Sequence, residues 1–244
     1  MITTMKVRLE PNNEQVSKLF QSAGTLHWYV TVGIEVVQEP VELTGESIGI
    51  DVGVKDLAIC SNVEEPYKNI NRMKKVKKLE KKLRRLQRKV SNKYEKNKEG
   101  RSYVKTGKIV KLEKNIRKLH KRLDNIRTDN RQKVTTEIAK TKPSRVVMES
   151  LNVSGMMKNK HLSKAIAQQG LFEFKQMMRY KCNRQNTEFV EADKWYPSSK
   201  TCSECGHVKT KLSLSEREFR CECCGAVIDR DKNAAINLSR YKAS

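Results

Sequence analysis

The stretch CECCGAVIDRDKNAAINL, from Cys221 to Leu238, brings two kinds of chemical group within a few residues of each other. A Cys-x-x-Cys pair with the spacing of metal ligands is followed, after four residues, by Asp229 and Asp231. These two acids stand at the start of an alanine-rich segment that favours a helix. The rest of the chain must explain why a metal-binding knuckle lies so close to a pair of carboxylates.

The cysteines of the chain fall into a pattern that is typical of zinc. Cys202 and Cys205 form a second Cys-x-x-Cys pair, fifteen residues before Cys221 and Cys224. Four thiolates at this spacing predict a tetrahedral Zn²⁺ site, and because the protein fills all four positions the ion is expected to be structural. A redox or unrelated cysteine cluster is the alternative.

The remaining cysteines are assigned other roles. Cys223 is spare within the second pair, and Cys60 and Cys182 are predicted to be buried apolar residues. Seven cysteines, an odd number, together with the absence of a signal peptide, favour metal ligation in a reducing cytoplasm over disulfide bonds.

Three acids stand at the ends of apolar segments: Asp51 in IGIDVGVKDLAI, Glu149 in RVVMES, and Asp231 with Asp229 nearby. Hydrolysis of a phosphodiester by two Mg²⁺ ions requires several carboxylates that hold the ions about 3.5–4 Å apart. Each acid also has a structural explanation: Asp51 could form a turn, Glu149 could be a surface residue, and Asp231 could be a helix N-cap. Burying an uncompensated carboxylate is costly, which favours a shared function.

The net charge of +23 indicates a polyanionic partner. Most of it is local, because residues 68–133 hold 27 Lys/Arg against 6 Asp/Glu. Apolar residues recur there at helical spacing in two runs, 76–90 and 109–126, which predicts an antiparallel hairpin of helices, each about 25–30 Å long. One dominant sign of charge favours contact with nucleic-acid backbones over a role in solubility alone. No apolar run is long enough to span a membrane, so nucleic acid is the favoured polyanion.

The other elements predict a mixed α/β fold. Residues 27–37 alternate like a half-buried strand, and two strands joined by a turn follow in SIGIDVGVKDLAICSN. After the hairpin come a strand over 144–152, a helix over 159–185 with a break at Gly170, and a strand over 187–193. The four histidines, at positions 27, 120, 161 and 207, do not cluster, and no phosphate- or dinucleotide-binding motif appears.

Five stretches together resemble a known family: GIDVGVKDLAICSN, VVMESLNVSGMMKN, WYPSSKTCSECG, LSLSEREFRCECCG and DRDKNAAINL. The sequence resembles the transposon-encoded TnpB-like proteins, also called OrfB zinc-ribbon proteins or transposases, to which compact type V CRISPR effectors are related. The resemblance covers most of residues 47–240, and the leader MKVRLEPNNEQVSKLFQSAG is also similar to the start of such a protein.

The resemblance implies a RuvC-like, ribonuclease H-type nuclease with a zinc ribbon inserted before its last catalytic element. Asp51, Glu149 and Asp231 are then the catalytic, Mg²⁺-binding acids, and Asp231 is chosen over Asp229 because the family acid stands two residues before Asn-Ala-Ala. Family members resemble RNA-guided DNA endonucleases, so DNA and an RNA from the transposon end are the implied partners.

The implied organisation has four parts. Residues 1–46 form a shortened β-rich segment, 47–195 the nuclease core with the basic hairpin 68–133, 196–228 the zinc ribbon, and 229–244 the last catalytic motif and a C-terminal helix. In the family a long helical segment separates the leader from the strand that WYVTVGIEVV resembles. Here only Thr25, Leu26 and His27 stand between Gly24, the end of the leader, and this strand, so the helical segment is expected to be missing.

Two alternatives stay open on the sequence. A shortened or cleavage-defective copy could bind transposon RNA or DNA without cutting it, and the chain could be a zinc-ribbon adaptor of transcription or translation. The three matched acids favour the Mg²⁺-dependent endonuclease over both.

Overall fold

The computed structural model describes residues 2–10, 12, 15, 29–35, 41–213 and 216–242. The chain divides into two compact units, Met1–Pro40 and Val41–Ser244. The boundary predicted between residues 46 and 47 therefore falls later than this division, inside the first strand of the second unit, which begins at Thr44.

The first unit contains a two-stranded antiparallel ribbon of β1 (Ile2–Arg8) and β2 (Tyr29–Glu35). A strand was predicted at the position of β2, but Val30 and Val32 are each 45% exposed, so the prediction of a half-buried face is wrong for these two residues. An isolated ribbon of two strands buries little of either face. His27, Trp28, Val36 and the Gly24–Thr25 junction lie outside the described residues.

The second unit is built on a five-stranded sheet in the order β5-β4-β3-β8-β9. In chain order these are β3 (Thr44–Val52), β4 (Asp56–Cys60), β5 (Tyr67–Lys68), β8 (Pro143–Glu149) and β9 (Glu188–Ala192). β4 is antiparallel to β3, whereas β8 is parallel to β3 and β9 is parallel to β8. The mixed sheet with its helices confirms the predicted α/β class.

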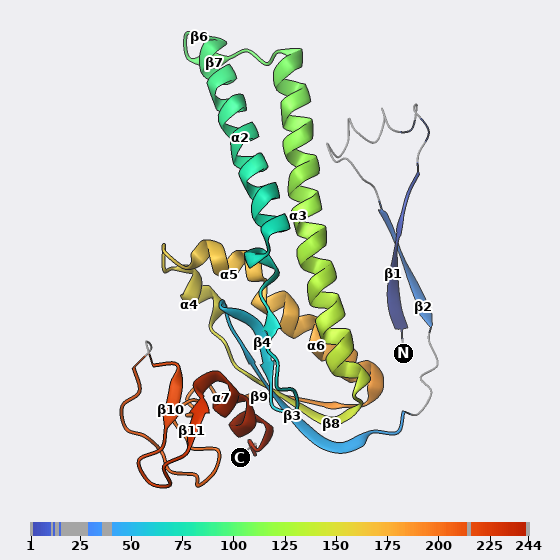
Figure 1. Ribbon diagram of the computed structural model, residues 1–244. Helices are drawn as coiled ribbons and strands as arrows, with labels where there is room; N and C mark the ends of the chain where they lie inside the picture. Colours follow the sequence, from blue (N-terminus) through green and yellow to red (C-terminus); the bar gives the residue numbers. More distant parts are fainter. Residues whose placement is uncertain are drawn as a thin grey trace. The chain divides into compact units, whose positions relative to one another are not determined.

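The two faces of this sheet are covered by different helices (Figure 1). On one face, Ile48, Ile50 and Met148 join a core with side chains of α3 (Gly107–Lys140) and α6 (Leu171–Gln185). On the other face lies α7 (Arg230–Ser239), which packs so closely on β3 that a Cβ on Gly49 would stand 2.0 Å from the Ala235 carbonyl oxygen. Glycine is therefore required at position 49, because backbone atoms of α7 occupy the space of a side chain.

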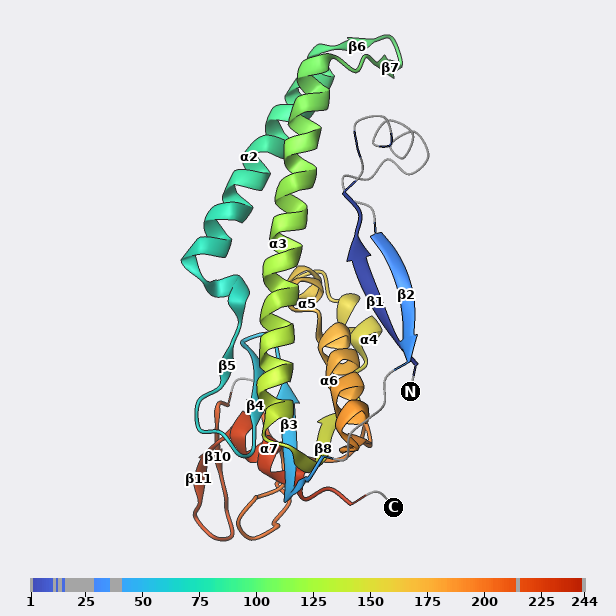
Figure 2. The ribbon, with the colours of Figure 1, turned by 90° about the vertical axis from the view of Figure 1, so that its right-hand side faces the viewer.

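The predicted helical hairpin is present and extends away from the sheet (Figure 1, Figure 2). After the short η1 (Ile70–Arg72), α2 (Lys74–Lys96) packs along α3 through buried Val76, Leu83, Leu119 and Leu123, and the tip carries β6 (Lys98–Glu99) and β7 (Ser102–Tyr103). The predicted length of about 25–30 Å is too short for both arms, since α2 has 23 residues and is about 35 Å long. α3 has 34 residues, about 51 Å, because Val134 and Ile138 continue its apolar rhythm into the core under the sheet.

The segment between β8 and β9 contains α4 (Val153–Met157), α5 (Ser163–Gln169) and α6. Gly170 separates α5 from α6 with a φ of +66°, which confirms the predicted break. The predicted helix start at residue 159 is wrong, since α5 begins at Ser163 and Leu162 is 46% exposed. None of the helices within the described ranges has both the length and the apolarity that a membrane span needs.

A small lobe precedes α7 and contains the antiparallel strands β10 (Glu218–Arg220) and β11 (Val227–Asp229). Phe219 is fully buried there against Cys202 and Cys221. β11 ends at Asp229 and α7 begins at Arg230, so no residue separates the lobe from the helix.

Candidate functional site

Asp51 and Glu149 lie side by side at the carboxyl ends of two neighbouring parallel strands. The register of β3 and β8 pairs Ile50 with Met148, so the next residue of each strand is an acid. Ile50 and Met148 face the α3–α6 core, and successive side chains alternate between the faces of a sheet. Both carboxylates therefore point to the face that α7 covers.

Asp231 reaches the same place because α7 runs antiparallel to β3. The Ser47 hydroxyl donates to the Ser239 carbonyl at 2.7 Å, and Gly49 lies against Ala235. Each step of four residues along α7, about 6 Å, therefore matches two residues along β3, about 6.7 Å. One further step puts Asp231, in the first turn of α7, beside Asp51.

The electrostatics of Asp51 agree with this placement. Its pKa is raised well above the ordinary value, first by burial and then by the negative charges of Glu149 and Asp231, while Arg230 opposes the rise. The Arg230 guanidinium lies 3.1 Å from Asp231 Oδ1. The site is thus a cluster of three acids whose mutual repulsion is only partly compensated, which is the condition under which a bound cation is favourable.

Among the described residues, the four cysteines are the one group of at least three His, Cys, Asp or Glu side chains placed closely enough to hold a single metal ion. The three carboxylates do not form such a group. A site for two ions about 3.5–4 Å apart does not require its carboxylates to surround a single ion.

The three acids and Asp229 occupy different positions in their elements. Asp51 lies within β3 and not in the turn after it. Asp229 is the N-cap of α7, because its Oδ1 accepts the N–H groups of Asp231 and Lys232, both at 3.0 Å. Glu149 is half-buried and accepts a hydrogen bond of 2.5 Å from the Ser198 hydroxyl. The turn explanation is therefore wrong for Asp51 and the cap explanation is wrong for Asp231, whereas Glu149 is a partly exposed residue whose carboxylate has a side-chain partner.

Ser198 belongs to a loop that α7 holds in place. Asn237 Nδ2 donates to the carbonyl oxygens of Ser198 and Thr201, at 2.8 and 2.6 Å. Asn233, one turn earlier, donates to the Thr201 carbonyl and accepts the Ser203 N–H. Neither amide was predicted as a functional residue, although two asparagines at i and i+4 on an alanine-rich helix lie on one face and are a usable signal.

Lys232 anchors the other side of the same helix. Its Nζ donates to the carbonyl oxygens of Cys60, Ser61 and Val63 at 3.0, 3.0 and 2.6 Å. These carbonyls lie at the end of β4 and just after it, so Lys232 binds the start of α7 to the sheet. Asn233 binds the same helix to the small lobe. This explains why the cysteines and the acids stand so close in the sequence: α7 connects the two.

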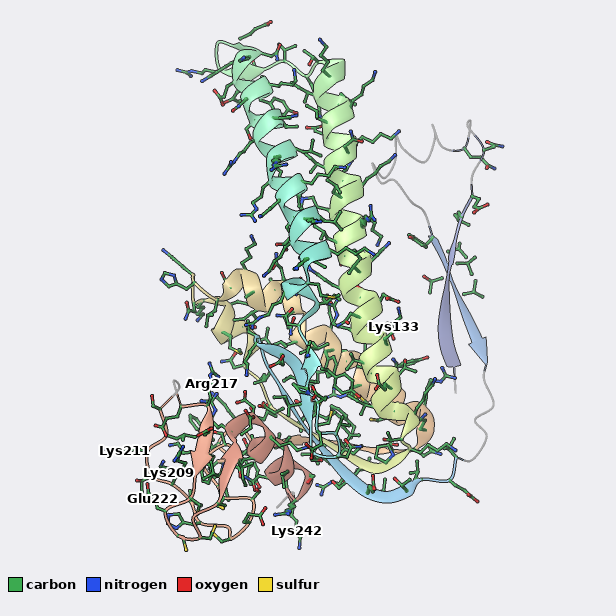
Figure 3. All side chains as sticks on the ribbon, in the orientation of Figure 1. Lys133, Lys209, Lys211, Arg217, Glu222 and Lys242 are labelled. Atoms are coloured by element: carbon green, nitrogen blue, oxygen red, sulfur yellow. The ribbon has the colours of Figure 1, made fainter. Side chains whose placement is uncertain are left out.

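The structure brings Cys202, Cys205, Cys221 and Cys224 together with all four Sγ atoms within 4.8 Å of one another. Two Sγ pairs, 202–224 and 205–221, are separated by 3.7 and 3.5 Å. A tetrahedral Zn²⁺ with Zn–S bonds of about 2.3 Å separates its sulfurs by about 3.8 Å, so the cluster fits such an ion. In the same lobe Lys209 lies 3.7 and 3.8 Å from Glu216 and Glu222 (Figure 3).

The three other cysteines are placed as predicted. Cys60 and Cys182 are buried, and Cys223 is exposed beside the cluster without contributing to it. Of the histidines, His120, His161 and His207 are exposed and belong to no ligand cluster in the described residues.

The basic hairpin stands apart from the acids as a separate charged element. Side chains tipped with nitrogen project along both helices (Figure 3). A few acids are paired within it, such as Glu80 with Arg127 at 2.8 Å and Glu113 with Lys105 at 2.8 Å. The large excess of Lys and Arg over acids leaves most of the positive charge uncompensated within the hairpin.

Two family models match the chain. The OrfB/IS605 model described as "Probable transposase" matches residues 29–160, and the model described as "Cas12f1-like, TNB domain" matches residues 172–238. Together they include the three acids and the four cysteines.

Curated relatives align along most of the chain. A "Putative RNA-guided DNA endonuclease" of Streptomyces pristinaespiralis is 34% identical over 94% of this chain and 52% of its own length. The "Putative RNA-guided DNA endonuclease InsQ" of Escherichia coli K12 is 31% identical over 89% of this chain and 54% of its own. The chain thus spans about half the length of these relatives.

Solved structures share the fold. The chain is similar to one in a "CRISPR-Cas12f Ternary Complex", with a TM-score of 0.57, 25% identity and coverage of 87% of this chain and 42% of that chain. A chain of a Cas12f1-sgRNA-target DNA complex gives a TM-score of 0.54 at 23% identity, over 87% of this chain and 53% of that one.

Proposed function

The chain belongs to the OrfB/IS605 transposase family of TnpB-like proteins, and from this premise we propose that it is a metal-dependent DNA endonuclease with a RuvC-like core. The observation that carries the proposal is the convergence of Asp51, Glu149 and Asp231 from two parallel strand ends and a helix start. Residues 47–195 and 229–244 would form the nuclease core, and 196–228 the zinc ribbon.

The three acids would hold two Mg²⁺ ions. When bound, the ions would supply Lewis-acid activation of the scissile phosphate and of the attacking water. The chain's own contribution is to aim the carboxylates: the β3–β8 register sets Asp51 beside Glu149, the Ser198 hydroxyl fixes one Glu149 oxygen, and α7 presents Asp231. The raised pKa of Asp51 supports this role, since a divalent ion would relieve the repulsion that causes it.

Zinc would have a structural role in the same site. Four cysteine thiolates leave no open position for a substrate. By fixing the lobe that contains Thr201 and Ser203, the ion would stabilise the loop to which Asn233 and Asn237 bind. The zinc ribbon would therefore set the position of α7 and of Asp231.

DNA is the proposed substrate and an RNA from the transposon end the proposed guide. The names of the relatives that align along the chain support both partners. The basic hairpin would bind phosphates, because its positive charge greatly exceeds its acids.

A pair of charge-matched variants tests the proposal. Asp231→Asn and Asp229→Asn each remove one negative charge from the start of α7, and asparagine caps a helix as well as aspartate does. In a plasmid-cleavage assay with Mg²⁺ and RNA from the protein's own element, Asp231→Asn should abolish cleavage, and Asp229→Asn should retain it.

The assay needs a binding measurement beside it. Loss of cleavage in Asp231→Asn with unchanged DNA affinity would support the assignment of the acids. Equal cleavage by both variants would contradict it. Tight binding by the wild-type protein with no cleavage under any condition would favour the alternative of a binding protein.

A further inference from the structure

Trp195 is the most exposed large apolar side chain in the described part of the chain. It is 81% exposed, whereas the next values, for Met73 and Val227, are 55%. Isolated apolar residues are common on surfaces, but an indole is the largest apolar group available, and leaving it in water forgoes most of its burial energy. This exposure suggests that the indole ring binds a partner molecule.

The segment that carries Trp195 is held in place on both sides. The backbone N–H of Trp195 donates to Asp193 Oδ1 at 2.7 Å, and the backbone N–H of Asp193 donates to the Tyr241 hydroxyl at 3.2 Å. The next residue, Tyr196, donates its hydroxyl to the Asn237 carbonyl at 3.0 Å and packs edge-on against Tyr241. The indole is thus presented outward from a fixed backbone.

This segment is also tied to the acids at both ends. Ala192, immediately before it, pairs with Glu149 in the register of β8 and β9. Ser198, three residues after Trp195, donates its hydroxyl to the same Glu149. A ring in the middle of a loop whose two ends contact Glu149 belongs to the surroundings of the three carboxylates.

The ring already binds a cation. Lys194 Nζ lies 4.9 Å from the ring centroid. At 81% exposure, most of the ring surface stays open while the lysine is there. An open aromatic face beside a cation is the combination that binds single-stranded nucleic acid, where a base stacks on the ring and a phosphate contacts the cation.

We propose that Trp195 is a stacking platform for an unpaired base of the DNA strand that enters the acidic site, with Lys194 contacting an adjacent phosphate. The strand must be unpaired there, because the faces of bases in a duplex are occupied by their neighbours. The choice of DNA rests on the proposed function, while the stacking itself does not depend on cleavage.

Fluorescence of Trp195 tests the proposal directly. The chain has two tryptophans, so Trp28→Phe leaves Trp195 as the only indole, and Asp51→Ala in the same protein removes cutting. Titration of this double variant with a dT oligomer should quench the emission and saturate, whereas a duplex should have a weaker effect. Unchanged emission, under conditions where anisotropy of a labelled oligomer reports binding, would overturn the proposal.

Affinity measurements add a matched control. Trp195→Ala should weaken dT binding roughly 5- to 150-fold, the range of one lost base–aromatic stack, and Trp195→Phe should retain much of the affinity. Phe172 is a suitable control, because it is 54% exposed, has Lys175 6.0 Å from its ring, and lies on α6, on the opposite face of the sheet. Phe172→Ala should leave dT affinity unchanged, and equal losses in both variants would overturn the proposal.

Comparing quenching with cleavage distinguishes a failure of the stacking proposal from a failure of the proposed nuclease function. Quenching by dT in a protein that never cleaves DNA would support the stacking role and remove the proposed function. Cleavage of DNA by the wild-type protein, with no quenching of Trp195 by dT, would support the proposed nuclease and overturn the stacking role. A response confined to a U-rich RNA oligomer would overturn the assignment to the DNA strand.

Discussion

Asp229 and Asp231 differ by only two positions, yet their carboxylates have different roles. Asp229 is committed to the backbone of α7, whose first free N–H groups it accepts, while Asp231 is left to face the acids of the sheet. An N-cap bonds two and three residues ahead, so the D-x-D spacing at a helix start could have identified the cap from the sequence alone. The choice of Asp231 came instead from the family resemblance.

The Ser198–Glu149 contact could not have been predicted in this way. The two residues are 49 positions apart, and only the strand β9 and its following loop bring them together. The same holds for Trp195, whose place near the acids depends on the pairing of Ala192 with Glu149. Local patterns identify candidate ligands, whereas the groups that position them are set by long-range pairing.

The raised pKa of Asp51 predicts an effect on stability. A carboxyl whose pKa is higher in the folded than in the unfolded protein destabilises the fold, and the loss develops as pH rises from the ordinary aspartate value, about 3.9, through the raised value. Without divalent ions, Asp51→Asn should therefore increase the free energy of unfolding at pH 7.5. The gain should shrink as the pH falls towards 4.

Urea unfolding of the zinc-loaded protein at both pH values would measure this change. Asp229→Asn is the control, and it should change the free energy of unfolding little because asparagine retains the cap. Mg²⁺ should stabilise the wild-type protein more than Asp51→Asn. A variant that is less stable than the wild type at pH 7.5 would mean that Asp51 is stabilised by its neighbours.

At the scale of elements, regular apolar spacing was the most reliable guide. It predicted both helices of the hairpin, because a seam between two long helices needs an apolar residue at every turn. It missed the last part of α3, where Val134 and Ile138 keep the same rhythm but the run of basic residues has ended. β10 and β11 have three residues each, too few for any periodicity to identify.

The different surroundings of the seven cysteines predict that a thiol reagent labels them in three stages: in the native protein, after zinc removal and after unfolding. At pH 8 the zinc-loaded protein should label once, at exposed Cys223, because zinc would hold the four ligand thiolates. Cys60 and Cys182 should stay unlabelled, since burial raises the pKa of each thiol to about 12. Removing zinc should add the four ligand cysteines, and full unfolding the last two.

Mass spectrometry of the intact protein would count the labels at each stage. Cys223→Ser should remove the label of the native protein and no other. Cys205 and Cys224 are exposed to solvent, so their thiols are accessible to the reagent. Their rapid labelling in zinc-loaded protein would contradict the assignment of the four cysteines to one ion.

At the scale of the whole molecule, the sheet order β5-β4-β3-β8-β9 could not be predicted from the sequence. β3 and β8 are neighbours in the sheet although 90 residues, including the hairpin, separate them in the chain. The charge distribution, by contrast, is a direct property of the sequence. Residues 68–133 hold a net charge of +21 out of +23, so the rest of the chain is nearly neutral. The positive field of the second unit therefore originates in one element that extends from the sheet.

This segregation predicts that the salt dependence of binding belongs to the hairpin. The logarithm of the affinity for DNA should fall linearly with the logarithm of salt concentration, with a slope of about −0.9 for each phosphate that the protein neutralises. Replacing four exposed basic residues of α2 by glutamine, Lys81, Lys82, Arg85 and Lys89, should flatten the slope by about 0.9 for each one that contacts a phosphate. The control replaces four exposed lysines outside the hairpin: Lys142, Lys158, Lys160 and Lys164. Both variants lose the same net charge. If phosphate contacts are confined to the hairpin, only the α2 variant should show a flatter slope. Equal flattening in both variants would indicate a general effect of charge and contradict the assignment. Because these side chains are remote from the core, unfolding should be unchanged in both variants, and the difference in slope reports binding alone.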